Sequence, residues 1–246
     1  MTTSHFTRRG VLAGTGLAIA LGLAACRASD KKADDAGSSP AAGSDGGSAA
    51  PSDGGSAAAG SDAGGRDIDR KLPYLELASD STGPTVDLLL DFRCPPCKEF
   101  MTMHTDYIDG LVHDAKAKVR IHPRPMLDAR RGSTYSQDTA SAAAAVYAQD
   151  PALLMPFEHA MYAAQAPTGD DPDPDLQQIA TIAKGVGADA TAVAQIMQRT
   201  YVPWTLDVVE PAAAKLDVGT PTVIVNGKIW EGDWSASGAL EKAISA

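Results

Sequence analysis

Two cysteines separated by two residues are the side chains best suited to chemistry in this chain. They are Cys94 and Cys97, with Pro95 and Pro96 between them. An apolar run at 86–90 precedes the pair and predicts a buried strand, and the apolar residues after it have helical spacing. Strand, Cys-x-x-Cys and helix in this order are typical of a redox dithiol. At a helix N-terminus the Cys94 thiolate would be stabilised, and the thiolate is the species that attacks in thiol–disulfide exchange.

A Cys-x-x-Cys pair can also be half of a zinc site or an inert structural disulfide. Zinc would need two more ligands, but the third cysteine, Cys26, lies far upstream, and the five histidines show no paired ligand spacing. A disulfide across two residues would close too small a loop to constrain the unfolded chain much. The sequence therefore favours redox chemistry, and we expect neither a metal nor a bound cofactor.

A second motif lies near the C-terminus. Thr220 and Pro221 precede an apolar run at 222–225, and Asn226-Gly227 follows it. Asn-Gly between two strand-like segments is typical of a two-residue hairpin turn. We therefore expect a loop, a proline, a strand and a hairpin in this order.

Together the two motifs resemble those of the DsbA-like branch of the thioredoxin superfamily. Residues 91–98, Asp-Phe-Arg-Cys-Pro-Pro-Cys-Lys, are similar to the branch's Asp-aromatic-x-Cys-Pro-x-Cys-Lys signature. The resemblance runs from about residue 72 to the C-terminus. It implies an α/β fold, thioredoxin-like with an inserted helical subdomain at about 130–215.

The resemblance also implies a role for each residue of the two motifs. Cys94 is expected to be the exposed nucleophile, and Cys97 the thiol that resolves the mixed disulfide. The Thr220–Pro221 bond is expected to be cis, with its backbone holding the substrate strand beside the sulfur atoms. Strongly oxidising relatives often carry His before the second cysteine. Pro96 offers neither an imidazole nor a backbone N–H, so we expect a less oxidising disulfide.

A carboxylate that moves protons is harder to assign. Many relatives carry Glu or Asp six residues before the first cysteine, and Leu88 occupies that position here. Asp87 is one residue away and should face the other side of the strand. Asp91 matches the acid of the branch's signature and is the candidate for proton transfer.

The first 25 residues predict a signal peptide. Arg8 and Arg9 precede an apolar stretch that is short for a membrane span. Residues 23–26, Leu-Ala-Ala-Cys, resemble the lipobox of bacterial lipoproteins, which implies that Cys26 is acylated and becomes the first mature residue. The alternative is an ordinary signal peptide followed by a chance cysteine. Residues 7–12 resemble a twin-arginine export signal.

A low-complexity segment separates the signal from the rest of the chain. Residues 26–66 contain the lipidated cysteine and a Gly, Ser, Ala and Asp-rich stretch that cannot bury enough apolar surface to fold, so we expect a flexible linker. Residues 67–246 are expected to form the DsbA-like domain. Loss of Arg8 and Arg9 with the signal takes the formal net charge from −10 to −12. An acidic protein is unsuited to binding nucleic acid.

The pattern of apolar residues, prolines and glycines sets the elements that must position the dithiol. We expect strands at 72–77, 86–92, 118–122, 222–225 and 228–230. We expect helices from the dithiol to about 115, and at 133–149, 151–165, 176–184, 188–201, 203–216 and 236–244.

These features predict an extracytoplasmic thiol–disulfide oxidoreductase, lipid-anchored to a bacterial membrane on its periplasmic or cell-surface side. As an oxidase it would introduce disulfides into cysteine-containing exported proteins. The resemblance implies reoxidation by a membrane quinone-linked partner, DsbB-like or VKOR-like. One alternative is a reductase or isomerase, for example in cytochrome c maturation. The other is a non-catalytic thioredoxin-fold binding protein or metallochaperone.

Overall fold

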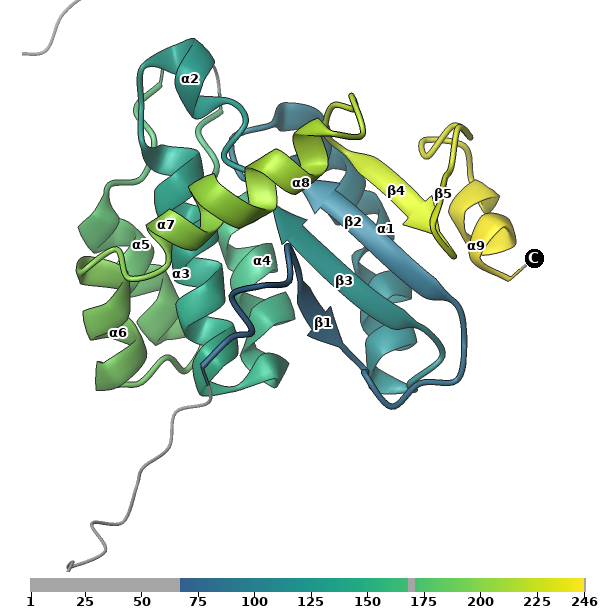
Figure 1. The fold of residues 1–246 in the computed structure, drawn as a ribbon, viewed down its shortest axis with the longest axis horizontal. Helices are drawn as coiled ribbons and strands as arrows, with labels where there is room; N and C mark the ends of the chain where they lie inside the picture. Colours follow the sequence, from purple (N-terminus) through teal and green to yellow (C-terminus); the bar gives the residue numbers. More distant parts are fainter. Residues whose placement is uncertain (1–66, 168–170, 246) are drawn as a thin grey trace, which may run out of the picture. The chain divides into compact units, whose positions relative to one another are not determined.

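The computed structural model describes residues 67–167 and 171–245. The predicted signal peptide, Cys26 and all of the predicted linker therefore lie outside the described residues. Within the described part the central feature is a five-stranded sheet in the order β1-β3-β2-β4-β5 (Figure 1). Its strands are β1 (Leu75–Leu77), β2 (Thr85–Leu90), β3 (Lys118–Pro123), β4 (Thr222–Val225) and β5 (Lys228–Ile229). β2 and β3 are parallel, and the other pairs are antiparallel.

Strand β2 is the middle strand of the sheet, and nearly all of its residues are buried. Its aliphatic side chains alternate between the two faces of the sheet. Leu88 belongs to the main hydrophobic core, whereas Leu89 packs with Ala213 and Ile224 in a smaller cluster. A strand covered on both faces holds the residues after it in a fixed position, and those residues include the dithiol.

Helix α1 (Pro95–His113) begins inside the Cys-Pro-Pro-Cys sequence, with Cys94 as its N-cap. Proline is tolerated in the first helical turn because the N–H groups there have no helical partner. The helix buries Phe100, Ile108 and Leu111 and connects β2 to β3. A helical crossover between parallel strands is the expected connection.

Between β3 and β4 the chain forms a helical region (Figure 1). Helix α3 is rich in alanine and almost wholly buried, so that neighbouring helices can approach it closely. The region contains α2 (Asp128–Arg131), α3 (Tyr135–Gln149), the 3₁₀ turn η1 (Pro151–Leu153), α4 (Leu154–Ala164), α5 (Leu176–Gly185), α6 (Ala190–Met197), α7 (Val202–Trp204), the π-helical turn η2 (Thr205–Val209) and α8 (Glu210–Ala214).

The structure differs from the expected elements in detail. Helix α2 is four residues long and was not predicted. The helix expected at 203–216 is interrupted by η2, whose widened turn lies just before Pro211. Proline lacks the N–H that a regular α-helix would donate to residue 207, so the hydrogen-bond pattern changes there. The edge strand expected at 72–77 is limited to β1.

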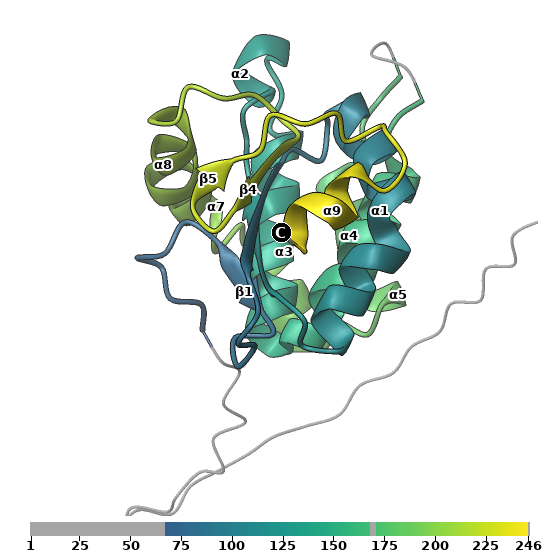
Figure 2. The same cartoon turned by 90° about the vertical axis from the view of Figure 1, so that its right-hand side faces the viewer.

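The chain ends with the β4–β5 hairpin and helix α9 (Ala239–Ile244). Helices α1 and α9 lie on one face of the sheet and α8 on the other (Figure 2). His104 of α1 contacts the loop before α9, with Nε2 2.8 Å from the Trp234 carbonyl oxygen. Among the described residues no helix is both long and apolar enough to span a bilayer. The α/β thioredoxin-like fold matches the prediction, whereas the predicted domain boundaries stay predictions.

Candidate functional site

The two cysteines lie at the start of α1, where the central strand ends. The Cys94 backbone is extended (φ −75°, ψ 116°), and its N–H donates to the Asp91 carbonyl at 3.0 Å. Its own carbonyl accepts from the N–H groups of Cys97 and Lys98, at 3.1 and 3.2 Å. Both cysteines are free thiols. Cys94 was expected to be exposed but has only 6% of its surface accessible, and Cys97 has none.

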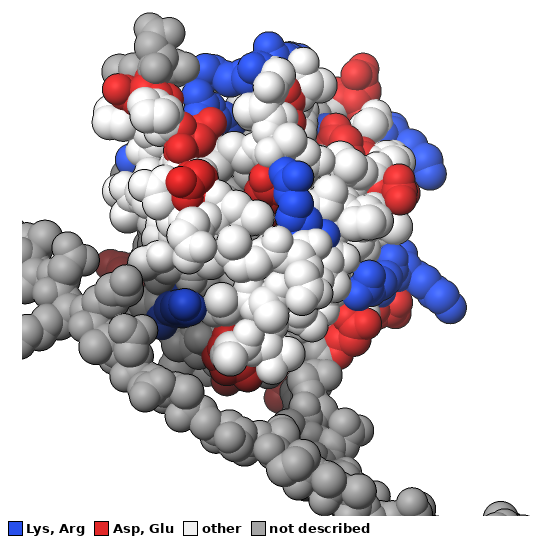
Figure 3. All heavy atoms as spheres, turned by 90° about the vertical axis from the view of Figure 1, so that its left-hand side faces the viewer, with Lys and Arg blue, Asp and Glu red and all other residues white. Residues whose placement is uncertain are grey.

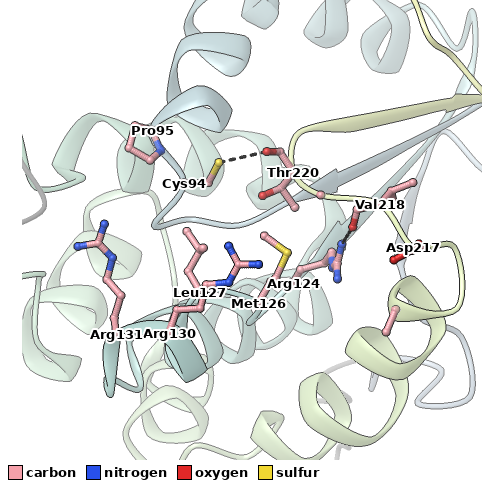
Figure 4. A pocket seen from close by; sticks show the side chains of 12 residues that line it. Cys94, Pro95, Arg124, Met126, Leu127, Arg130, Arg131, Asp217, Val218 and Thr220 are labelled. Carbon is pink, nitrogen blue, oxygen red and sulfur yellow. Dashed lines mark hydrogen bonds between the residues drawn. The ribbon is translucent and has the colours of Figure 1, made fainter.

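The Thr220–Pro221 loop faces the dithiol because β4 pairs with β2. The Thr220–Pro221 peptide bond is cis, as expected. The Cys94 thiol donates to the Thr220 carbonyl oxygen at 3.3 Å. The Thr220 hydroxyl is buried, has no hydrogen-bond partner in the described part of the chain, and points to the Cys94 side of the loop (Figure 4). The structure thus brings the two predicted motifs together.

The pKa values of the two cysteines are shifted in opposite directions. A hydrogen bond from Cys97 lowers the pKa of Cys94 to about 6, against the opposing effect of burial, and the Thr220 side chain lowers it further. Burial raises the pKa of Cys97 well above its usual value, and the neighbouring Cys94 raises it further. Near neutral pH the dithiol therefore carries its negative charge on Cys94 and its remaining proton on Cys97.

Asp91 is the carboxylate that acts electrostatically on Cys94. It is fully buried and accepts hydrogen bonds from the N–H groups of Arg93 (2.8 Å) and Leu127 (2.9 Å) and from the Ser136 hydroxyl (2.7 Å). Burial raises its pKa to about 6 in spite of these donors. Its negative charge raises the pKa of Cys94, so the two groups interact electrostatically. A carboxyl group that titrates near pH 6 can both accept and release protons near neutral pH.

The position six residues before Cys94, where many relatives carry an acid, lies in an apolar environment. Leu88 is fully buried in the main core. Asp87 points to the opposite face, where its carboxylate lies 2.9 Å from Nε2 of His122 on β3. Asp87 is therefore engaged on the side of the sheet away from Leu88.

Gln165 is a residue of the site that the sequence did not reveal. Its buried side-chain amide donates to the Phe92 carbonyl at 2.7 Å and to the Cys94 carbonyl at 3.1 Å. The backbone carbonyl of Gln165 accepts a hydrogen bond from Lys98 Nζ at 3.5 Å. Gln165 follows α4, some 70 residues along the chain from the dithiol. No sequence pattern distinguishes it from other polar residues at helix ends.

The segment after Gln165 contacts the dithiol loop a second time. Asp173 forms an ion pair with Arg93, the residue before Cys94, and both side chains are largely buried. The connection between α4 and α5 is thus anchored to the loop on both sides of the Arg93–Cys94 peptide bond. This anchoring restrains the backbone that carries the reactive sulfur.

Cys94 borders a pocket with a cavity volume of about 630 Å³ (Figure 4). Cys94 and Pro95 form one wall, and Val218 to Thr220 form another. A third wall comes from the segment around α2 and includes Leu127 and Arg130. Within the described ranges no group of three or more His, Cys, Asp or Glu side chains could hold a metal ion.

Comparison with known proteins agrees with this geometry. The thioredoxin family model matches residues 79–246, more than half of the chain. The chain belongs to the thioredoxin family. Among curated proteins, serine/threonine-protein kinase PknE of Mycobacterium tuberculosis is 31% identical over 116 residues. That match covers 46% of this chain and 20% of the kinase, so the chain spans about a fifth of that relative's length.

Solved structures of thiol–disulfide oxidoreductases have the same fold. The disulfide bond oxidoreductase DsbG of Mycobacterium tuberculosis aligns with a TM-score of 0.61 and 25% identity, covering 71% of this chain and 88% of DsbG. DsbA of the same organism aligns at 0.61 and 24%, covering 71% and 93%. MdbA of Actinomyces oris aligns at 0.60 and 20%, covering 71% and 87%. The predicted DsbA-like thioredoxin fold is confirmed.

Proposed function

We propose that this thiol–disulfide oxidoreductase of the DsbA type works outside the cytoplasm and oxidises cysteine pairs in exported proteins. The observation that carries the proposal is the asymmetry of the dithiol. The Cys94 thiol has a lowered pKa of about 6 and faces the Thr220 carbonyl, while Cys97 is buried with a raised pKa. A cysteine with a low pKa is a good leaving group, and a stabilised thiolate favours the reduced form of the enzyme.

The oxidation transfers two electrons from the substrate to the enzyme; of the two protons that the substrate thiols lose, one is taken up by Cys97 and the other is released to solvent near neutral pH. In the oxidised enzyme a substrate thiolate attacks Cys94, the Cys94–Cys97 bond breaks, and Cys97 leaves as a thiolate that takes up a proton. A second substrate thiolate then attacks the substrate sulfur of the mixed disulfide, and Cys94 leaves. The substrate gains a disulfide, and the enzyme is left as the dithiol seen in this structure.

Reoxidation of the enzyme removes two electrons from the dithiol. The Cys94 thiolate attacks a disulfide of the redox partner, and Cys97 must lose its proton to resolve the intermediate. Asp91, whose pKa is raised to about 6 by burial, is the proposed acceptor of that proton. A membrane quinone-linked protein, DsbB-like or VKOR-like, is the proposed partner.

The Cys94 pKa also limits how oxidising the enzyme is. The nucleophilic cysteine titrates near pH 3.5 in DsbA and near pH 7 in thioredoxin, and their potentials are about −120 and −270 mV. A value of about 6 supports a potential between these limits. It therefore also supports the second candidate function, a disulfide reductase or isomerase.

The redox potential of the dithiol and the direction of the exchange reaction distinguish the two functions. Equilibration of the purified protein with glutathione gives the potential, and incubation with a reduced, unfolded two-cysteine protein gives the direction. We expect a potential above about −200 mV and formation of the substrate disulfide. A potential near −270 mV, with net reduction of a disulfide substrate, would exclude the oxidase.

The proposed location rests on the N-terminal residues. The Leu-Ala-Ala-Cys junction at 23–26 supports lipid attachment at Cys26, and the arginine pair at 8–9 supports export. A lipid anchor followed by a linker of about 40 residues, with an r.m.s. reach of roughly 35 Å, would let the domain meet exported chains near the membrane.

A further inference from the structure

The proposed reaction needs a proton donor inside the protein. When a substrate thiolate attacks Cys94, the electron pair of the broken disulfide moves to the Cys97 sulfur. None of the surface of Cys97 is accessible to solvent, so the proton that it takes up must pass through neighbouring side chains. Burial disfavours the thiolate of Cys97 and raises its pKa well above the usual value. A donor that is itself protonated near neutral pH would therefore ease the departure of Cys97.

Helix α4 carries two buried polar side chains that the mechanism described so far does not use. Glu158 is fully buried, and neither carboxyl oxygen has a hydrogen-bond partner in the described part of the chain. The Tyr162 hydroxyl, one helical turn further along, is also buried and has no such partner. Residues four apart lie on the same side of a helix. Buried polar atoms without partners are rare in folded proteins and call for a functional explanation.

Tyr162 lies between this part of α4 and the dithiol. Its ring stacks on Phe92 of the dithiol loop, with ring centroids 5.2 Å apart. It also lines a cavity of about 350 Å³ together with Lys98 and Met101 of α1, which leaves room for water molecules. Met101 is four residues after Cys97, and both side chains are buried on the same side of α1. The ring of Tyr162 is thus held where α1, α4 and the dithiol loop meet.

The electrostatic contacts of Tyr162 agree with this position. Burial raises the pKa of its hydroxyl well above the usual value, and the negative charges of Cys97 and Glu158 raise it further. The Tyr162 hydroxyl is therefore within electrostatic reach of both groups.

Among the described residues, no charged group shifts the pKa of Glu158, and burial alone raises it to about 8. Helix α4 packs against α1, α3 and α5. Helices α3 and α5 have one charged residue each, Asp138, which pairs with Arg199 at 2.6 Å, and the exposed Lys184. The other ionisable residues of these helices are Tyr135 and Tyr147 of α3 and Cys97, Lys98, Glu99, His104, Asp106, Tyr107, Asp109 and His113 of α1. Figure 3 shows charged side chains at the surface of the helical region, where they contact water and not the buried carboxyl group.

Asp91 and Glu158 therefore differ in their protonation near neutral pH. Asp91 has a pKa of about 6 and is mostly ionised, which suits it to accept a proton. Glu158 is mostly protonated, which suits it to donate one. Two carboxyl groups whose environments move their pKa values apart can serve as the acid and the base of one reaction.

We propose that Glu158 is the proton donor for Cys97 when substrate reduces the enzyme, and that the Tyr162 hydroxyl passes the proton between them. The inference rests on the proposed function, since it adds two residues to the first step. In that step the Cys94–Cys97 bond breaks, a bond forms between Cys94 and the substrate sulfur, and Cys97 receives the electron pair. The Tyr162 hydroxyl gives its proton to the Cys97 sulfur and takes the Glu158 proton. The Glu158 carboxylate then regains a proton from solvent through the cavity beside Tyr162.

Reduction of the oxidised protein by dithiothreitol, followed by acid quench and alkylation, tests the inference. The rate is divided by the concentration of dithiothreitol thiolate, so that only the protein's titration remains. At pH 6 to 7 we expect Glu158→Gln to be reduced about tenfold more slowly than wild type, less than a typical general acid contributes because a thiolate can leave unaided. Above pH 8 Glu158 ionises in wild type as well, so the two rates should converge. A purely structural role would not produce this dependence on pH.

Tyr162→Phe keeps the ring on Phe92 and removes the hydroxyl, and it should show the same loss and the same convergence. Two controls make the same chemical changes elsewhere. Glu241→Gln alters a half-buried carboxyl on α9, one oxygen of which has no hydrogen-bond partner in the described ranges. Tyr201→Phe removes a hydroxyl that donates to Asp67 at 2.8 Å. Both controls should stay within about twofold of wild type at every pH.

The other outcomes are distinct. Equal rates for wild type and Glu158→Gln, or a loss that is the same at every pH, would overturn the inference and leave the proposed function standing. If Asp91→Asn gives the pH-dependent loss and Glu158→Gln does not, Asp91 is the donor and the inference is wrong. An unchanged Tyr162→Phe would overturn the role of the hydroxyl. Wild-type protein that dithiothreitol does not reduce would overturn the proposed function as well.

Discussion

At the residue scale, the site depends on two neighbouring sulfur atoms in different environments. Cys94 lies at the N-terminus of α1 with donors around it, and Cys97 lies inside the core under the same turn. The thiolate is stabilised where hydrogen-bond donors and the helix dipole reach it, and the thiol persists where burial excludes charge. The division of labour between the cysteines follows from this difference.

Replacement of either cysteine should reveal that division. Cys94→Ser should abolish dithiol oxidase activity, whereas Cys97→Ser should accumulate mixed disulfides with substrates. In the reduced wild type the alkylation rate should rise with a midpoint near pH 6, and mass spectrometry of peptides should place the label on Cys94. Labelling of Cys97 first at low pH would reverse the assignment.

The residue before Cys97 offers a second prediction at this scale. Pro96→His restores a backbone N–H and adds an imidazole, and both should stabilise the Cys94 thiolate. One pKa unit corresponds to about 1.4 kcal/mol, which is about 30 mV for two electrons. The potential measured against glutathione should rise by tens of millivolts. An unchanged potential would point instead to the loop at Thr220.

At the element scale, helix α4 and the residue after it contact the dithiol loop. Tyr162 stacks on Phe92, with ring centroids 5.2 Å apart, and Gln165 at the end of the helix holds the Phe92 and Cys94 carbonyls. The helix also buries Glu158 completely, and neither carboxyl oxygen has a hydrogen-bond partner in the described part of the chain. Burial raises the pKa of Glu158 to about 8.

Glu158 should make the protein less stable as the pH rises. The folded state keeps this carboxyl protonated up to about pH 8, whereas the unfolded chain ionises it above about 4.5. Unfolding then releases a proton, so the free energy of unfolding falls by up to about 1.4 kcal/mol per pH unit in that window. Below pH 6 the raised pKa of Asp91 adds an effect of the same sign. Between pH 6 and 8 the lowered pKa of Cys94 acts in the opposite direction, so the difference between wild type and a Glu158 variant, rather than the wild-type slope, reports on Glu158.

Glu158→Gln removes the ionisable group and should remove its falling contribution to the stability. Denaturant unfolding at pH 6 and pH 8 should show the variant gaining about 3 kcal/mol over wild type across the interval. Glu231→Gln, at an exposed position, is the control and should follow wild type. Parallel pH dependences of wild type and Glu158→Gln would contradict a protonated Glu158.

The clamp formed by Gln165 leads to another prediction at this scale. Gln165→Leu removes the donor to the Phe92 carbonyl and loosens the Cys94 backbone, which should cost about 1–3 kcal/mol of stability. It should also raise the pKa of Cys94, because the sulfur is held less firmly at the helix N-terminus. The alkylation midpoint of Cys94 measures this shift.

A second bridging glutamine provides the matched control. Gln149 donates to the Gly187 carbonyl and accepts from the Asp189 N–H, linking α3 to the segment before α6. Gln149→Leu should lower stability without moving the alkylation midpoint. If both variants leave the midpoint unchanged, Gln165 is structural only.

At the scale of the whole molecule, we propose separate tasks for the acidic catalytic domain and for the residues that precede it. The domain carries the dithiol and its pocket, and the preceding residues are proposed to set where they act. Cys26→Ser should release the protein from the membrane fraction and remove the mass of the acyl groups. Cys94→Ser makes the same chemical change in the domain and should stay with the membrane. A wild-type protein absent from membranes, with an unmodified Cys26, would contradict the lipid anchor.

The sequence alone predicts those features that have a local physical cause. An apolar run predicts β2, two prolines after Cys94 are compatible with a helix start, and Asn226-Gly227 predicts the hairpin. The resemblance carried by the two motifs added the thioredoxin-like fold and the opposition of Cys94 to the Thr220–Pro221 loop. These features depend on short stretches whose residues constrain one another directly.

The environment of the dithiol depends on how the whole chain packs. The tertiary structure placed Gln165 on the Cys94 carbonyl, three donors on the Asp91 carboxylate, and the arginines of α2 at the pocket. It also enclosed most of the surface of Cys94 and all of Glu158. Each of these facts joins residues that are distant in the chain, apart from the short Asp91–Arg93 contact. Burial and long-range hydrogen bonds depend on how helices pack on the sheet, and no local pattern of residue types specifies that packing.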